Sequence, residues 1–254
     1  MKTANRLSIC FALALFLLLP LSTLAQWNKK PYTEWSEKEA AKLLEDSPWS
    51  QKQTFTDTSK SASTTTSRGS SQTTIADVIN VNFQIRFFTA KPVRQAISRV
   101  MELQQKGEMP DQMAARLKAL ATADFPDYII ITVTCDGDRA SNMLQQARSV
   151  LQKISTATIK NSTYLVTKEG RRVFLQEYQP PRNDGLGARF VFPRLVDGNP
   201  FITPEGGELL FHAELGGDST LNSTIANSDV ARNGFTLNMR YKIKDMMVDG
   251  KLEY

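Results

Sequence analysis

Residues 79–87 read INVNFQIRF, and their side chains alternate between apolar and polar. Successive side chains of a β-strand point to opposite faces, so one face would carry Ile79, Val81, Phe83, Ile85 and Phe87. This period of two predicts a strand with one dry and one wet face. Residues 234–243 repeat the alternation and predict a second strand of the same kind.

Helical and strand patterns surround these two segments. Apolar residues at helical spacing predict helices that begin at Pro92 and Pro110 and a third over Arg139–Ile154. The run YIIITVTC at residues 128–135 predicts an interior strand covered on both faces. Further strands are predicted at residues 164–167, 172–178, 188–192 and 208–215, with a type I′ turn at Asp249-Gly250. The expected fold class is α+β, a mainly antiparallel sheet packed with about three helices.

The first 25 residues have the composition of a signal peptide. Lys2 and Arg6 precede an apolar run over residues 11–21, and small residues follow at Thr23 and Ala25. We therefore expect the mature chain to begin at Gln26 and to be secreted or periplasmic. Because the run falls short of the roughly 20 apolar residues of a membrane span, no integral span is expected after cleavage, although retention of the segment as an anchor stays open.

Composition and charge exclude several classes of protein. Apolar residues at 41% and charged residues at 22% are typical of a globular protein rather than a disordered or polytopic membrane chain. The full chain has a formal charge of +5, and without Lys2 and Arg6 it keeps 29 basic and 26 acidic residues, a charge of +3. That surplus is too small to predict a nucleic-acid partner.

The mature chain divides into three further regions. Residues 26–55 contain Trp27, Trp35 and Trp49, which we mark as candidate interaction residues, and a short helix predicted over Glu37–Asp46. Ser36 followed by Glu39 fits a capping box at the start of that helix. Its narrow apolar stripe predicts that it docks either on its own domain or on a partner or membrane surface.

The second region, residues 56–74, is dominated by Ser and Thr and holds no large apolar side chain. Such a segment cannot bury enough surface to offset its ordering entropy, so we predict a flexible linker. Residues 75–254 form the third region, the α+β domain, which is long enough to bury a sizeable core.

The most enzyme-like residues are Cys135, Asp138 and His212. Cys135 would end a strand before a helix N-terminus, where a thiol pKa can fall, and His212 is the chain's one imidazole. Strand parity, however, puts Cys135 on the side of Ile131 and Val133 and predicts a packing residue. Asp138 is expected to be an N-cap, and His212 a solvated strand residue between Phe211 and Ala213.

No cofactor and no metal are predicted. The sequence has neither a P-loop nor a complete G-x-G-x-x-G fingerprint, and no G-x-S-x-G nucleophile elbow. One cysteine and one histidine are too few for a usual zinc site. An all-oxygen calcium site near Asp136 and Asp138 or at Asn183-Asp184 stays open, although neither place has EF-hand spacing.

Three motifs carry a resemblance. Residues 35–49, WSEKEAAKLLEDSPW, are similar to an N-terminal motif of uncharacterised secreted bacterial proteins. Residues 86–94, RFFTAKPVR, and 244–252, KDMMVDGKL, resemble further parts of that family. The resemblance implies bacterial export and supplies no activity, so no catalytic residue can be carried over.

Two hypotheses follow. The first is a non-catalytic binding or structural module of the bacterial cell envelope, whose partner would be an envelope protein or ligand that the sequence does not identify. The alternative is a hydrolase or transferase that uses Cys135 with His212. The two differ in whether that thiol is exposed beside the imidazole or buried.

Overall fold

The computed structural model describes residues 29–57, 63–67, 70–74, 79–139, 141–216 and 234–254. The predicted signal peptide and Trp27 therefore lie outside the described residues. Within them the fold is α+β, as predicted, with antiparallel sheets and five α-helices, four of which have nine residues or more. No helix among these residues is long and apolar enough to cross a membrane.

Two sheets form the centre of the molecule. The five-stranded sheet has the order β1-β4-β5-β9-β8, and the four-stranded sheet has the order β13-β12-β6-β7. The strands are β1 (Ser50–Asp57), β4 (Ile79–Phe87), β5 (Tyr128–Gly137), β6 (Thr163–Thr167), β7 (Arg172–Phe174), β8 (Glu177–Gln179), β9 (Ala188–Pro193), β12 (Glu208–Leu215) and β13 (Phe235–Lys242). Every pairing between neighbours is antiparallel, and β5 lies in the middle of its sheet, as its continuous apolar run predicted.

The inner faces of the two sheets pack against each other through aromatic rings. The ring centroids of Phe83 and Phe235 lie 5.0 Å apart, and those of Phe190 and Phe211 lie 5.6 Å apart. Burial alternates strictly along β13, in agreement with its sequence pattern. Pairs at this spacing add directional contacts to the hydrophobic burial that holds the core together.

A side chain joins the sheets along one edge. The amide of Gln53 on β1 donates from Nε2 to the Thr236 carbonyl at 2.9 Å and accepts at Oε1 from the Asn238 amide at 2.8 Å. It thereby makes the two bonds that a neighbouring strand would make with β13. An exposed strand edge is a site of unwanted pairing, so this contact both closes the sandwich and protects the edge.

At the other edge the chain passes from one sheet to the other. The Leu175 amide donates to Thr163 in β6, and the next amide, that of Gln176, donates to Val191 in β9. The single strand predicted over residues 172–178 is therefore wrong. It is split into β7 and β8 because consecutive amides there bond to different sheets.

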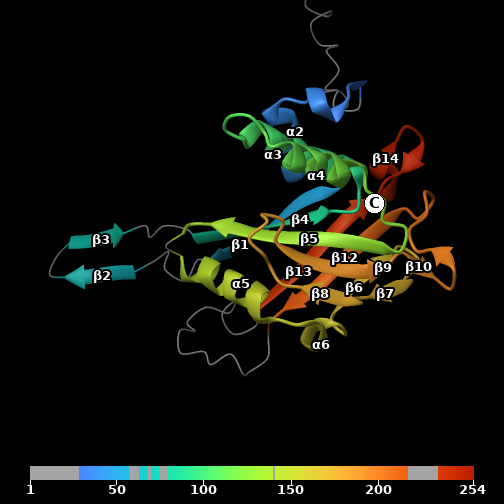
Figure 1. Ribbon diagram of the computed structural model, residues 1–254. Helices are drawn as coiled ribbons and strands as arrows, with labels where there is room; N and C mark the ends of the chain where they lie inside the picture. The colour runs from blue at the N-terminus through green and yellow to red at the C-terminus, as the bar shows by residue number, and fades with distance from the viewer. Residues whose placement is uncertain (1–28, 58–62, 68–69, 75–78, 140, 217–233) are drawn as a thin grey trace, which may run out of the picture.

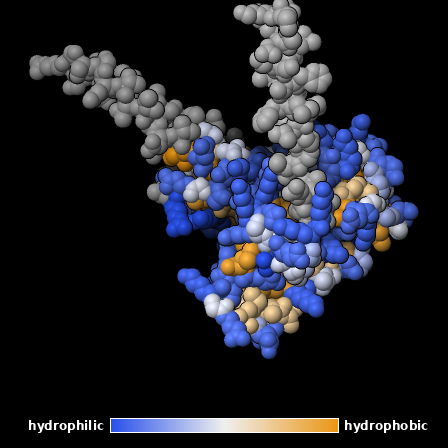
Figure 2. All heavy atoms as spheres, turned by 90° about the horizontal axis from the view of Figure 1, so that it is seen from above, coloured by the Kyte–Doolittle hydropathy of each residue, from blue (hydrophilic) through white to orange (hydrophobic). Residues whose placement is uncertain are grey.

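The helices lie on two sides of the strands (Figure 1). On one side are α2 (Glu37–Glu45), α3 (Lys91–Gln104) and α4 (Asp111–Thr122), and on the other α5 (Asn142–Lys153) and α6 (Thr156–Ile159). Arg94 of α3 is 3% exposed and donates to the carbonyls of Leu120 and Ala123, which ties α3 to the end of α4. Figure 2 shows that the face above α2–α4 is mostly hydrophilic, with small separate hydrophobic patches.

The start of α5 differs from the prediction. Its N-cap is Ser141, whose Oγ accepts from the Leu144 amide at 3.3 Å, and not Asp138. The reason is that β5 runs on past Cys135: Asp136 and Gly137 still pair with Asn82 and Val81 of β4. The helix can begin only after this ladder ends and the chain has turned.

The described part of the N-terminal segment belongs to the packed fold. All eight residues of β1 pair with β4, and Trp35 and Trp49 are 2% and 1% exposed. The predicted capping box is confirmed at Ser36 and Glu39. Of the two alternatives for this segment, docking on its own domain is thus the one observed for residues 29–57.

The region predicted as a linker, residues 56–74, is only partly described. Thr56 and Asp57 end β1, and β2 (Ser63–Ser67) pairs with β3 (Ser70–Thr74) in a separate hairpin. The flexibility of the region stays a prediction. Two-residue strands form further hairpins: β10 (Leu195–Val196) with β11 (Asn199–Pro200), and β14 (Met247–Val248) with β15 (Lys251–Leu252).

Candidate functional site

A pocket of about 370 Å³ lies where three distant parts of the chain meet. Its walls come from the segment before α2, from the first turn of α3 and from the β14–β15 hairpin. We call it the junction pocket. Its volume is within the range of pockets that hold small molecules.

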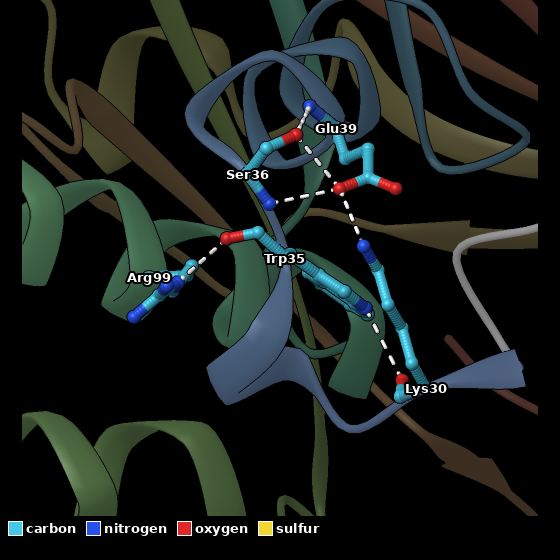
Figure 3. A network of polar contacts seen from close by, with 5 residues as sticks. All are labelled: Lys30, Trp35, Ser36, Glu39 and Arg99. Carbon is cyan, nitrogen blue, oxygen red and sulfur yellow. Dashed lines mark hydrogen bonds and ion pairs between the residues drawn. The ribbon is translucent and has the colours of Figure 1, made fainter.

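Figure 3 shows the polar network that fixes the N-terminal wall of the pocket. Glu39 Oε2 accepts from the Ser36 amide and from Lys30 Nζ, both at 2.8 Å. The indole of Trp35 donates to the Lys30 carbonyl at 3.3 Å, and Arg99 Nε donates to the Trp35 carbonyl at 2.7 Å. The capping box of α2 thus holds Lys30, and α3 holds Trp35 through Arg99, so that both residues line the pocket.

These contacts change the acidity of Glu39. The hydrogen bond from Lys30 and those from Ser36 favour the ionised carboxylate, and they lower its pKa to about 2. The carboxylate therefore stays charged throughout the physiological range and keeps Lys30 in place.

The opposite wall of the pocket is the β14–β15 hairpin. Asp249 and Gly250 have φ angles of 49° and 78°, which confirms the predicted type I′ turn. Trp49 Nε1 donates to the Glu253 carbonyl at 2.7 Å, and Arg194 Nη1 donates to the Tyr254 carbonyl at 2.8 Å. Trp49 therefore supports one wall of the pocket while Trp35 lines another.

The lining combines apolar surface with charges of both signs. Tyr32, Pro92 and Val248 supply apolar surface, and burial is the main reason that the pKa of Tyr32 is raised. Three lysines and two carboxylates also line the pocket: Lys30, Lys91, Lys251, Asp249 and Glu253.

Most of these charges are already paired. Lys30 is bound to Glu39, and Lys251 Nζ lies 3.7 Å from Glu253 Oε1. Within the described part of the chain, Lys91 and Asp249 make no ion pair. The pocket therefore presents one cation from α3 and one anion from the hairpin.

Cys135 lies on the inner side of β5, where Ile131 and Val133 are fully buried, but is itself only partly buried against the core. Burial raises the pKa of its thiol, while the nearby Arg148 guanidinium opposes this rise less strongly. Burial has the larger effect on this pKa, as is expected for a thiol that packs against a core.

His212 lies on the outer face of the four-stranded sheet. Its ring stacks on Tyr164 with centroids 4.7 Å apart, and its Nδ1 lies 2.7 Å from Asn238 Oδ1. Phe211 and Ala213, which alternate with it, are fully buried, so the predicted parity is confirmed. Because Cys135 faces the interior and His212 faces outward from another sheet, the structure does not bring them together.

The remaining candidate residues do not form a site either. Asp138 lies in the turn after β5, where its carbonyl accepts from the Ser141 amide. Asp136 accepts from the Asn82 amide side chain at 3.0 Å. Across the described ranges, no three His, Cys, Asp or Glu side chains are grouped as metal ligands would be.

Sequence reasoning missed the junction pocket. In the sequence, Pro92 and Asp249-Gly250 are signals for a helix start and a turn and parts of two resemblance motifs, but they are not indicated as parts of one site. Residues 30, 91 and 249 are far apart in sequence, and no local pattern indicates that they meet. Tertiary contacts such as the pairing of β1 with β4 and the anchoring of the hairpin by Trp49 bring these three segments together.

Comparison of the chain with protein-family models, with curated proteins and with solved structures finds no match. The resemblance to secreted bacterial proteins therefore rests on its three motifs alone.

Proposed function

We propose that this protein is an exported, non-catalytic binding module of the bacterial cell envelope, and that the junction pocket is its binding site. The observation that carries the proposal is the pocket itself, in which apolar walls and an unpaired charge of each sign face a common space. Ligand sites in general combine apolar walls with a few placed polar groups.

The non-catalytic part of the proposal is supported by the positions of the reactive side chains. Neither Cys135 nor His212 lines the pocket, and its described lining includes no Ser or Thr hydroxyl. A nucleophile needs a base within hydrogen-bond reach, and Cys135 and His212 lie on different faces of different sheets. No observation favours the hydrolase or transferase alternative.

The export part of the proposal is supported by sequence alone, through the charged, apolar and small-residue regions of residues 1–25. Its test is the intact mass of the protein recovered from the periplasm or medium of a bacterial host. A chain that begins at Gln26 supports export, and a cytoplasmic chain that keeps residues 1–25 contradicts it.

The binding part is tested by NMR on the mature chain with a mixture of small fragments. Fragments that bind should shift the amide signals of Gln95 and of the hairpin. Gln95→Trp, which fills the pocket, should abolish these shifts, whereas Gln104→Trp at the far end of the same helix should not. Shifts that survive Gln95→Trp, or that map elsewhere, would place the binding site outside this pocket.

A further inference from the structure

Resting on the proposed function, we propose that the junction pocket takes a small zwitterion of the amino acid or short-peptide class. The ligand's carboxylate would pair with Lys91 and its ammonium group with Asp249. Its side chain would lie against Tyr32, Pro92 and Val248, which belong to the apolar part of the lining.

Lys91 is the group that selects the carboxylate. It is the first residue of α3, it is exposed, and the first turn of that helix contains no acidic residue. The ammonium groups of Lys30 and Lys251 already have carboxylate partners at 2.8 Å and 3.7 Å. A ligand anion would therefore find its free cation at Lys91, close to the positive end of the helix.

Asp249 is the group that selects the ammonium. It lies at the tip of the β14–β15 hairpin and is exposed. Glu253, the other carboxylate of the lining, lies beside Lys251 and also interacts with the buried Arg94. Because Glu253 already faces two cations, the negative charge left for a ligand is that of Asp249.

The two free charges have opposite signs and lie on different elements, with Lys91 on α3 and Asp249 on the β14–β15 hairpin. A purely anionic ligand would leave Asp249 unpaired and facing it, and a purely cationic ligand would do the same with Lys91. Each mismatch leaves a charge without compensation at the site, which disfavours that ligand. A zwitterion satisfies both walls at once.

The experiment compares three probes that share the phenylalanine side chain and differ in which charged group they carry. They are L-phenylalanine, N-acetyl-L-phenylalanine, which lacks the ammonium, and L-phenylalanine amide, which lacks the carboxylate. Each is titrated into the mature protein to about 10 mM, above the millimolar dissociation constant expected for a small ligand. Phenylalanine should bind at least about tenfold more tightly than either analogue, as expected from the loss of one charged contact.

Two variants test which residue binds each charged group of the ligand. Lys91→Gln should weaken phenylalanine about tenfold and remove its advantage over the amide, while its advantage over the N-acetyl analogue remains. Asp249→Asn should do the reverse.

The control variants change matched residues elsewhere. Lys38→Gln removes an exposed lysine from the first turn of α2. Asp197→Asn changes the other aspartate with positive φ, at 52° in the β10–β11 hairpin. Both should leave all three affinities unchanged.

The possible failures are distinct. Equal affinity for the three probes, no binding of phenylalanine, or equal effects of the site variants and their controls would overturn this inference. If fragments still shift Gln95 and the hairpin in that case, the proposed function survives. If none does, both proposals fail.

Discussion

On the outer face of the five-stranded sheet, Gln84 and Thr132 are 6% and 1% exposed, whereas on the outer face of the four-stranded sheet Phe174 is 48% exposed. Hydrophobicity alone would have predicted the reverse. Gln84 and Arg86 donate to the carbonyls of Glu45 and Leu44, at the end of α2. Polar side chains that satisfy the last carbonyls of a helix can therefore hold that helix over a sheet.

We call the outer face of the four-stranded sheet the open face. Its aromatic residues contact side chains of the same sheet instead. The ring of Tyr164 is stacked on His212, and the Arg172 guanidinium carbon lies 4.7 Å from its centroid. Lateral stacking of this kind shields part of each ring without a covering helix. In this protein the face covered by a helix is therefore the one whose polar side chains bond to backbone carbonyls of that helix, and not the face with exposed aromatic residues.

The largest effect is expected from Trp49→Ala, which removes the anchor of the segment that covers the five-stranded sheet. Trp49 is 1% exposed, so we expect a loss of about 4 kcal/mol in the free energy of unfolding. Urea denaturation measures it. Trp49→Phe should cost less, and an unchanged midpoint in Trp49→Ala would show that the cover is not part of the cooperative unit.

A matched pair of arginines compares the two outer faces directly. Arg86→Met leaves the Leu44 carbonyl without its donor, at an expected cost of about 2 kcal/mol. Arg240→Met on the open face removes a 3.8 Å ion pair with Glu208, at a cost below about 0.5 kcal/mol. Similar losses for both variants in urea denaturation would remove the contrast between the faces.

Substitutions of Cys135 and His212 test whether the inner face of the five-stranded sheet and the outer face of the four-stranded sheet behave independently. Cys135→Ala should cost about 1 kcal/mol, because one partly buried sulfur is lost. Since burial raises the pKa of the thiol, labelling by a thiol reagent at neutral pH should be slow. His212→Ala should not change the labelling rate, and fast labelling that slows in this variant would restore the enzyme hypothesis.

Glu39 lies in α2, the helix whose end covers the five-stranded sheet, and it makes the stability of the protein depend measurably on pH. Its pKa is about 2 in the folded protein against 4.5 for an ordinary glutamate, so its contribution is present above about pH 4.5 and is lost as the pH falls toward 2. Because the side chain is one-third exposed, we expect only about 0.5 kcal/mol.

Urea midpoints between pH 6 and 2 measure this contribution. Glu39→Gln should flatten the change below pH 4.5, whereas Glu37→Gln in the same helical turn should not. The same profile in both variants would assign the acid sensitivity to other groups.

The smallest effect is expected at Phe174. Phe174→Thr keeps a strand-forming residue on β7 and should change the unfolding free energy by no more than about 0.5 kcal/mol. Thermal denaturation is sufficient to detect a larger value. A loss comparable with that of Arg86→Met would show that the open face is held together as tightly as the covered one.

Most strands of the two sheets could be predicted from sequence, but the edge strand β1 could not. Alternation correctly predicted β12 and β13, whose buried faces are continuous rows of apolar residues. It missed β1, because SQKQTFTD contains Phe55 as its one apolar residue. An edge strand that pairs through backbone bonds and one bridging glutamine leaves little trace in a hydrophobic pattern.

The prediction that the polar face of β4 is exposed to solvent was only half right. Asn80 is exposed, but Gln84 on the same face is covered by the end of α2. The polar pattern could not reveal this cover, since a glutamine bonded to water and one bonded to a helix end have the same sequence. The pocket was hidden for a similar reason, because each of its charged residues is a common surface type.

The bond between Trp49 and the Glu253 carbonyl joins residues 204 positions apart. Closing a loop over such a separation is entropically costly, and this contact can form only after Glu253 itself has left the ribosome. Topologies rich in contacts between residues this far apart in sequence fold slowly.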